Sequence, residues 1–325
     1  MSKLLDVKNL RVNYNTDEGT VYALNGLELE LNKGESLGLV GETGAGKTTL
    51  ALSVLRLLPE KVGEVVEGSI EFEGESLLDL GKKDMQKIRG HRIAMIFQDP
   101  MSSLNPTKTV GKQLKEVLEL HFGKLSRKEK QERVDSMFRL VGIPPERQNE
   151  FPFQFSGGMK QRIGIAMALI AQPELLIADE PTTALDVTIQ AQILDLMKKL
   201  QTEMNTSTIM ITHDLGIVVE NCTRIAVIYS GQIIESGTVE DVYSRKDNHP
   251  YTEGLFKCIP DLKSDAARLT PIKGSMADPM NLPAGCKFCD RCDYATERCM
   301  REEPELYKNG SHGIKCFKYA EGWSD

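Results

Sequence analysis

The chain has 325 residues, with 40 Lys and Arg against 47 Asp and Glu, and a formal net charge of −7 at pH 7. This negative balance repels phosphate backbones, so we expect no nucleic-acid partner, and at roughly 150 residues per domain the length predicts about two domains. No apolar signal segment opens the sequence, and the longest apolar run, residues 163–178, is interrupted and shorter than the ~20 residues of a membrane helix, so we expect a soluble, cytoplasmic chain.

Strand and helix patterns alternate along the first three-quarters of the sequence. In chain order we expect strands at 4–14 and 26–40, a helix at 53–58, a hairpin at 67–77, helices within 110–140 and at 158–171, a strand at 175–179, a helix at 187–204, a strand at 208–212 and a hairpin at 224–237. Ser126 and Glu129 have capping-box spacing, and Asp186 stands at an N-cap position. The alternation predicts an α/β domain with a largely parallel sheet. After about residue 245 prolines, glycines and cysteines dominate, which predicts a second, smaller unit.

The segment GETGAGKT at residues 41–48 follows an expected strand and precedes an expected helix. The pattern G-x-x-x-x-G-K-[ST] is typical of a phosphate-binding loop, because its glycines let successive backbone N–H groups point at one anion. Lys47 can then reach the β- and γ-phosphates of a nucleotide, and the Thr48 hydroxyl can bind Mg²⁺. We therefore predict nucleotide contacts at Gly41, Glu42, Thr43, Gly44, Ala45, Gly46, Lys47, Thr48 and Thr49.

Two further patterns bear on the class of nucleotidase. An apolar strand ends at Asp179 and Glu180, so both carboxylates are expected at the sheet edge where the phosphate loop also lies. Asp179 is a candidate Mg²⁺ partner, and Glu180 is a candidate general base for an attacking water. Ser156, Gly157 and Gly158 open another helix, whose free N–H groups offer a second anion site. The chain therefore has two phosphate-binding helix starts.

With these motifs the sequence resembles, over about residues 1–255, the ATP-binding subunits of ATP-binding-cassette (ABC) transporters. In that family the Ser-Gly-Gly signature of one subunit closes over the ATP that the phosphate loop of another subunit holds. Phe155 and Met159 depart from the commonest signature, in which leucine and glutamine stand, but Ser156 and both glycines are kept.

The resemblance also implies roles for residues outside the three motifs. Gln98 would sense Mg²⁺ and the attacking water, and His213 would contact the γ-phosphate. Tyr14 would stack on adenine, with Tyr22 as the alternative, and residues 184–186 would contact the opposite subunit. We therefore expect a competent site for MgATP hydrolysis.

The same resemblance implies the architecture. We expect a P-loop NTPase of the ABC type over residues 1–255, with a RecA-like core, an antiparallel β subdomain and a helical subdomain at about 98–160. A small cysteine-rich metal-binding extension would occupy residues 256–325. In the family, the helical subdomain docks a short cytoplasmic helix of the membrane subunit.

Three segments narrow the resemblance further: QDPMSSLNP at 98–106, FPFQFSGGMKQR at 151–162 and NHPYTEGL at 248–255. Together they are similar to the ATP-binding subunits of dipeptide, oligopeptide and nickel importers. This implies a second, homologous ATPase subunit, two integral membrane permease subunits, an indirect link to an extracytoplasmic solute-binding protein, and a peripheral location on the cytoplasmic face of the membrane. Nickel or another small solute is an alternative cargo, and a soluble ABC ATPase outside transport is the alternative class.

Five cysteines follow one another near the end of the sequence as C-x2-C-x2-C-x6-C-x16-C. In a reducing cytosol such a group favours a metal site over disulfides, and the spacing leaves zinc and an iron–sulfur cluster open. The importer resemblance, whose extension carries C-x5-C-x6-C and a later cysteine, implies a [4Fe–4S] cluster, with Zn²⁺ as the alternative. The implied ligands are Cys286, Cys292, Cys299 and Cys316, which leaves Cys289 spare. We expect the metal to cross-link and stabilise this region, which has few large apolar side chains to form a core.

Overall fold

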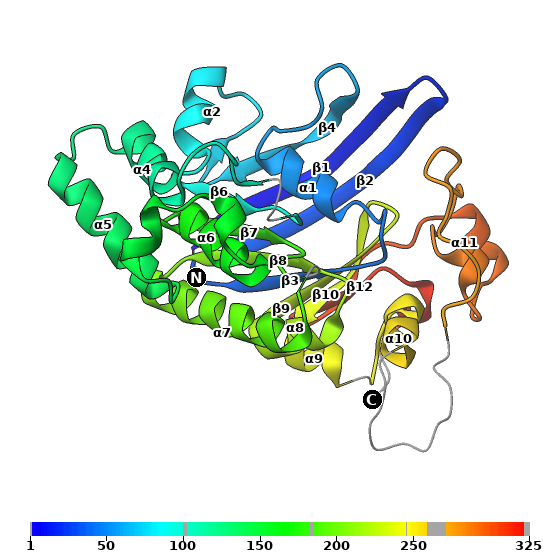
Figure 1. The fold of residues 1–325 in the computed structure, drawn as a ribbon. Helices are drawn as coiled ribbons and strands as arrows, with labels where there is room; N and C mark the ends of the chain where they lie inside the picture. The colour runs from blue at the N-terminus through cyan, green and yellow to red at the C-terminus, as the bar shows by residue number, and fades with distance from the viewer. Residues whose placement is uncertain (1, 100–102, 183–184, 245, 259–270, 322–325) are drawn as a thin grey trace. The chain divides into compact units, whose positions relative to one another are not determined.

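A computed structural model of the chain describes residues 2–99, 103–182, 185–244, 246–258 and 271–321 (Figure 1). The chain folds into two compact units. The unit that we call the helical unit comprises Met1–Ser2, Asn32–Ser36 and Asp79–Ile211, and the one that we call the loop unit comprises Lys3–Leu31, Leu37–Leu78 and Thr212–Asp325. Within the described ranges, no helix combines the length and the apolar character needed to span a membrane.

The helical unit is built on parallel strands, as the alternating sequence pattern predicts. Strands β6 (Ile93–Ile96) and β7 (Leu175–Asp179) pair in parallel, and β7 pairs in parallel with β8 (Ser207–Thr212). All five residues of β7 are buried, so this strand has apolar neighbours on both faces. The helices of the unit are α2 (Lys82–Ile88), α4 (Val110–His121), α5 (Arg127–Leu140), α6 (Gly157–Leu169) and α7 (Val187–Met204), with short 3-10 turns η1 (Pro145–Asn149) and η2 (Pro152–Gln154).

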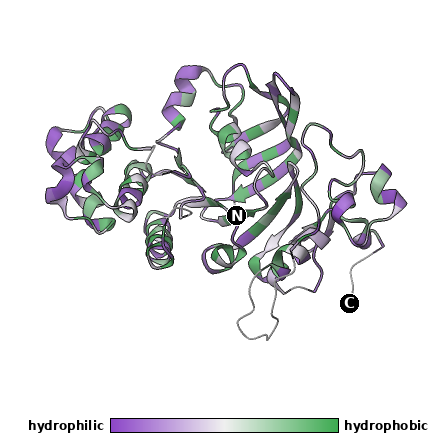
Figure 2. Ribbon diagram, turned by 45° about the vertical axis from the view of Figure 1, so that its right-hand side comes forward, coloured by the Kyte–Doolittle hydropathy of each residue, from purple (hydrophilic) through white to green (hydrophobic). Residues whose placement is uncertain are grey.

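Local signals in the sequence determine where several of these helices begin. Ser126 and Glu129 form the predicted capping box at the start of α5, with the Ser126 N–H donating to Glu129 Oε2 at 2.7 Å. Asp186 caps α7 as predicted, since its Oδ1 accepts from the Ile189 N–H at 3.0 Å. In Figure 2 several helices show both green and purple stretches, as expected where a helix buries one face.

The loop unit contains an antiparallel sheet near its N-terminal end. The strand order is β2 (Gly19–Asn32), β1 (Lys3–Thr16), β4 (Gly63–Phe72) and β5 (Glu75–Ser76), and β1 pairs antiparallel with β4. The predicted hairpin at residues 67–77 is confirmed, because Glu71 lies opposite Ser76. This sheet supplies the antiparallel part of a mixed α/β architecture.

The second sheet of the loop unit carries the glycine-rich loop. Strand β3 (Ser36–Val40) pairs in parallel with β9 (Arg224–Tyr229), which forms an antiparallel hairpin with β10 (Gln232–Thr238). The predicted turn at Ser230 and Gly231 is confirmed, and both residues have positive φ, 42° and 75°. The remaining helices of this unit are α1 (Lys47–Val54), α8 (Leu215–Asn221), α9 (Val239–Tyr243), α10 (Pro250–Lys257) and α11 (Glu297–Arg301), with the 3-10 turns η3 (Cys289–Arg291) and η4 (Phe317–Tyr319).

The helix expected at 53–58 is wrong in its position. Helix α1 begins at Lys47, inside the glycine-rich motif, and ends at Val54. Arg56 takes a positive φ of 51°, which no α-helix continues through, and its Nη1 donates to Leu77 O at 3.1 Å. The apolar residues after Val54 therefore belong to the turn that leaves the helix.

The C-terminal extension contributes strands to this second sheet. Strand β12 (His312–Ile314) pairs antiparallel with β10, and β11 (Tyr307–Asn309) pairs with β12. Because Thr212–Asp325 clusters as one piece with the N-terminal sheet, the contacts do not divide the chain at residue 255. The boundary between 1–255 and 256–325 stays a prediction.

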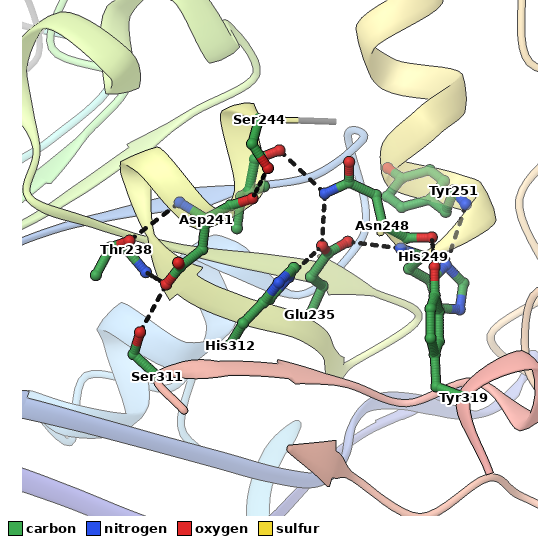
Figure 3. Close-up of polar contacts among 11 residues, drawn as sticks. Glu235, Thr238, Asp241, Ser244, Asn248, His249, Tyr251, Ser311, His312 and Tyr319 are labelled. Atoms are coloured by element: carbon green, nitrogen blue, oxygen red, sulfur yellow. Dashed lines mark hydrogen bonds and ion pairs between the residues drawn. The ribbon is translucent and has the colours of Figure 1, made fainter. Parts of the chain in front are cut away.

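A buried carboxylate holds the extension in place (Figure 3). Glu235 of β10 is 0% exposed, and His312 Nε2 lies 2.7 Å from its Oε1. The side chain of Asn248 donates to the same oxygen at 2.8 Å, and the His249 backbone N–H donates to Oε2 at 2.9 Å. Tyr319 near the C-terminus completes the network by donating its hydroxyl to Asn248 O at 2.8 Å. A buried charge is tolerated here because both of its oxygens are hydrogen-bonded.

Candidate functional site

The glycine-rich loop has the strand–loop–helix geometry of a phosphate-binding loop. It connects β3 to α1, and Gly44 and Gly46 have φ angles of 84° and 105°. A side chain at Gly46 would be strained by this φ, and its Cβ would lie 2.8 Å from Ala23 O. The conformation turns the loop around the start of α1, and the N-terminal end of a helix is a favourable place for an anion.

Lys47 is held within the loop that it is expected to serve. Its side chain is buried, and its Nζ donates to Gly41 O at 2.7 Å and to Glu42 O at 3.0 Å. A buried ammonium needs such partners, because leaving it unpaired is costly. The arrangement keeps a positive charge at the centre of the loop, where the phosphates of a nucleotide would bind.

The two aromatic candidates for adenine differ in their surroundings. Tyr14 of β1 is half-buried, and its hydroxyl donates to Thr49 Oγ1 of α1 at 3.2 Å. Tyr22 is 41% exposed, and its backbone N–H donates to Pro279 O at 2.8 Å. The Tyr14 ring therefore lies beside the helix that starts at the phosphate loop, while its stacking role stays a prediction.

In the helical unit, two predicted catalytic residues contact each other. Gln98 Nε2 donates to Glu180 Oε2 at 3.1 Å, although 82 residues separate them in sequence. Asp179 ends β7 and is 3% exposed, whereas the next residue, Glu180, takes a positive φ of 46°. That φ is unusual for a non-glycine residue, and such strained positions are concentrated at functional sites.

The signature segment begins helix α6, as predicted. Ser156 caps the helix, its Oγ accepting from the Met159 N–H at 3.4 Å. A Cβ at Gly157 would meet nothing within 4 Å, so this helix start is open, whereas a Cβ at Gly158 would lie 2.7 Å from Ile189 Cγ2 of α7. The unusual Phe155 is buried at 4% exposure, and the Arg147 guanidinium lies 4.4 Å from its ring centroid, so it occupies an apolar position as leucine would.

Gln161 is a residue of this region that sequence reasoning did not single out. It lies on α6, is 1% exposed, and its Nε2 donates to Pro181 O at 2.5 Å. The bond ties the signature helix to the residue that follows Glu180. Its only sequence signal is a polar residue on the buried face of a helix, which a single sequence cannot distinguish from an exposed glutamine.

The predicted residues are divided between the two units. The loop unit holds residues 41–49, Tyr14 and the exposed His213, and the helical unit holds Gln98, the signature and the carboxylates after β7. The division falls between Ile211 and Thr212, so His213 is the second residue of the last segment of the loop unit. Of the segment 184–186, residue 184 lies outside the described residues, as do residues 100–102 of the segment at 98–106.

The C-terminal cysteines surround one cavity of about 370 Å³. Its lining includes Cys286, Cys289, Cys292, Cys299 and Cys316. All five thiols are free, and burial raises the pKa of Cys286 to about 12. However, no group of three or more His, Cys, Asp or Glu side chains in the described part of the chain is arranged to hold a metal ion. The described residues of the extension therefore show a cavity lined by cysteines, but they do not show the expected metal site.

His249 lines the same cavity and carries an unpaired polar atom. The ring is 1% exposed, and its Nδ1 accepts from the Tyr251 backbone N–H at 3.0 Å. Burial lowers the pKa of His249 to about 3, so the ring is neutral and its hydrogen resides on Nε2. Nε2 has no hydrogen-bond partner among the described residues. An orphaned buried donor of this kind indicates a site for a further acceptor.

Comparison with known families matches both parts of the chain. Residues 24–183 match the family model described as ABC transporter, and residues 234–299 match the one described as oligopeptide/dipeptide transporter, C-terminal region. The oligopeptide transport ATP-binding protein OppD of Bacillus subtilis is 49% identical over 98% of this chain and 89% of its own length. The dipeptide transport ATP-binding protein DppD of the same organism is 48% identical over 98% of this chain and 95% of its own length.

Solved structures of ATP-binding cassettes share the fold. The cbiO1 protein of Clostridium perfringens, part of the ABC transporter complex cbiONQ, superimposes with a TM-score of 0.65 at 30% identity, over 76% of this chain and 92% of that one. The cassette MJ0796, solved as a dimer in a post-hydrolysis state with ADP and phosphate bound, superimposes with a TM-score of 0.64 at 28% identity, over 73% of this chain and 99% of that one. The fold is therefore the mixed α/β P-loop NTPase fold of ABC ATPases, and this chain belongs to the family of ATP-binding subunits of oligopeptide and dipeptide ABC transporters.

Proposed function

We propose that this chain binds and hydrolyses MgATP as a peripheral subunit on the cytoplasmic face of a membrane, and that it powers the import of di- or oligopeptides. The observation that carries the proposal is similarity over nearly the whole chain, including the C-terminal region, to ATP-binding proteins named for oligopeptide and dipeptide transport. That C-terminal match favours a transporter over a soluble ABC ATPase. Peptides are favoured over nickel because those relatives are named for peptide transport.

In the proposed reaction the phosphate loop orients the triphosphate and Glu180 accepts a proton. Lys47 exchanges its loop carbonyls for the β- and γ-phosphate oxygens, and the start of α1 binds the remaining phosphate charge. The water oxygen attacks the γ-phosphorus, its proton passes to the Glu180 carboxylate, and the bond to the β–γ bridging oxygen breaks, which gives ADP and phosphate. Gln98, which contacts Glu180, is proposed to orient that water, and His213 is proposed to contact the γ-phosphate.

The donor set proposed for Mg²⁺ fits that cation, because hydroxyl, amide and carboxylate oxygens are its preferred ligands. Thr48, Gln98 and Asp179 are the residues that we propose to hold it. When bound, Mg²⁺ neutralises charge on the β- and γ-phosphates. In support of this role, Asp179 is the last residue of β7 and is buried, and a carboxylate in such a position is stabilised by a cation.

A second cassette subunit is proposed to complete each ATP site. The start of α6 at Ser156 and Gly157 is open, which suits a phosphate approaching from another chain. We propose that the partner is a homologous but distinct subunit, so that the pair is a heterodimer. Residues 185–186, at the start of α7, belong to the segment proposed to contact that partner.

Two membrane permease subunits are proposed as further partners, with the solute-binding protein linked only through them. A largely apolar cavity of about 390 Å³ in the helical unit supports this docking. Phe97 and Leu120 line it and are 43% and 75% exposed. Large apolar side chains exposed around a groove mark a surface that a partner helix can cover.

We further propose that the cysteine cavity holds a [4Fe–4S] cluster on Cys286, Cys292, Cys299 and Cys316. The cysteines line one cavity, and thiolates are the ligands that such a cluster would take, with Zn²⁺ as the alternative. The unpaired Nε2–H of His249 fits an acceptor sulfur in the same cavity. When bound, the cluster would cross-link the extension. Iron and sulfide, with absorbance near 400 nm, are expected in anaerobically purified protein, and stoichiometric zinc instead would overturn this assignment.

Purification of the intact complex followed by reconstitution tests the main proposal. Co-purification with two membrane subunits and ATP-dependent uptake of a labelled dipeptide or oligopeptide into vesicles are the expected results. Recovery with ribosomes or DNA and without permeases would support the soluble alternative, and uptake of nickel but of neither peptide would change the cargo.

A further inference from the structure

An arginine of the cysteine-rich region forms two hydrogen bonds with a glutamate of the phosphate loop. Arg291 Nη1 donates to Glu42 Oε2 at 2.7 Å, and Nη2 donates to Glu42 Oε1 at 3.0 Å, although the two residues are 249 positions apart in sequence. The contact is bidentate and charge-assisted, which is the strongest form of side-chain hydrogen bonding between ions. The Arg291 side chain is only 5% exposed and that of Glu42 is 31% exposed, so solvent screens the pair less than it screens a surface pair.

The guanidinium is also fixed from its own side. Arg291 Nε donates to Lys273 O at 2.8 Å, and Nη1 lies 3.4 Å from Tyr229 Oη. Its Cζ lies 5.8 Å from the ring centroids of both Tyr229 and Phe288. Because each of these contacts restrains the side chain, the Arg291 guanidinium is already oriented towards Glu42. It therefore loses little conformational freedom when it pairs with the Glu42 carboxylate.

Glu42 is held at three points, and each of them bears on the phosphate site. Its backbone N–H donates to Tyr251 Oη at 2.9 Å, and its carbonyl accepts from Lys47 Nζ at 3.0 Å. Its carboxylate is neutralised by Arg291. Without that neutralisation, a negative charge would stand in a loop that must bind a triphosphate, and a like charge weakens anion binding.

The local fold of the extension determines where Arg291 stands. It is the last residue of the short turn η3, between Cys289 and Cys292. The ring of Phe288, directly before this turn, packs edge-on against Tyr229 at 5.2 Å and against Tyr251 at 5.5 Å. The turn is therefore fastened to the same aromatic residues that contact Glu42 and Arg291.

We propose that Arg291 is a positioning residue for ATP binding, through which the cysteine-rich extension sets the charge and conformation of the phosphate loop. The inference rests on the proposed role of residues 41–48 in holding the ATP phosphates. It assigns to the extension a direct influence on nucleotide affinity, in addition to any structural role.

The test is a set of ATP affinities measured on the full-length chain. We expect Arg291→Gln to weaken MgATP binding about tenfold, which corresponds to about 1.4 kcal/mol, because the Glu42 carboxylate loses its counter-ion. The double variant Arg291→Gln with Glu42→Gln should regain most of that loss. A residue that only supports the fold would not be rescued by removing a charge elsewhere. Arg301→Gln is the matched control, since Arg301 lies in the same extension, is 78% exposed and pairs only at 3.5 Å with Glu297.

Further variants separate failure of this inference from failure of the proposed site. Lys47→Ala should abolish ATP binding, and unchanged binding there would refute the phosphate-loop assignment itself. If Lys47→Ala abolishes ATP binding while Arg291→Gln has the same ATP affinity as the Arg301→Gln control, only the role of Arg291 is wrong. The same conclusion follows if the double variant binds ATP no better than Arg291→Gln. Should Arg291→Gln fail to fold by circular dichroism, Arg291→Lys replaces it, with an expected loss of about threefold from one missing hydrogen bond. Unchanged affinity in that variant would overturn the inference.

Discussion

Replacing the buried carboxylate of Glu235 by the amide of glutamine should destabilise the loop unit measurably. Glu235 Oε1 accepts from two side chains, those of His312 and Asn248, and Oε2 accepts from the His249 backbone N–H (Figure 3). Glutamine has one acceptor oxygen and one NH₂ group of nearly the same shape. In either orientation at least one buried donor must then face the NH₂ group, and a buried donor without an acceptor costs about 1–3 kcal/mol.

The expected loss is therefore about 1–3 kcal/mol in the free energy of unfolding, and urea denaturation of the purified chain measures it. Amide exchange of Lys315 gives a local readout, because its N–H donates to Ile234 O at 2.8 Å where the extension joins β10. Glu305→Gln is the control, since Glu305 is exposed. If the free energy of unfolding of Glu235→Gln lies within about 0.5 kcal/mol of that of the unchanged chain, as is usual for surface substitutions, the network does not stabilise the extension.

Three further predictions concern catalysis, the signature helix and acid stability. Glu180→Gln should lower ATP turnover of the assembled complex by at least about 10²-fold, the contribution typical of a general base, while ATP still binds; turnover at the unmodified rate would remove Glu180 from this role. Gly158→Ala should cost about 1–3 kcal/mol of stability by crowding α7, whereas Gly157→Ala, which meets open space, should not, and thermal unfolding compares the two. A hydrogen bond from Ser311 lowers the pKa of Asp241, so the stability gained there is complete above the unfolded value of about 3.9 and is lost as pH falls through the folded one. Ser311→Ala should raise that pKa in an NMR titration, and an unchanged value would contradict the assigned cause.

Short stretches of sequence were sufficient to predict local features of the fold and the phosphate loop of the site. The phosphate loop, the capping box at Ser126 and the turn at Ser230 each depend on the conformations and hydrogen bonds of a few consecutive residues, so their residue types determine them. The expected helix at 53–58 failed for the same local reason, because neither the start of α1 inside the loop nor the bend at Arg56 is visible in an apolar pattern.

Only the tertiary structure decided which distant side chains meet. The pairs Gln98 with Glu180, Glu235 with His312 and Glu42 with Arg291 are separated by 82, 77 and 249 residues. Nothing in the neighbouring sequence of either member specifies its partner, because each contact arises where strands and turns from different parts of the chain pack together. Motifs thus predicted an ATP-binding subunit from the sequence alone. The hydrogen bonds from Arg291 of the cysteine-rich extension to Glu42 of the phosphate loop could be recognised only in the folded chain. The packing of the extension against the loop, and no local sequence pattern, brings this arginine to its carboxylate.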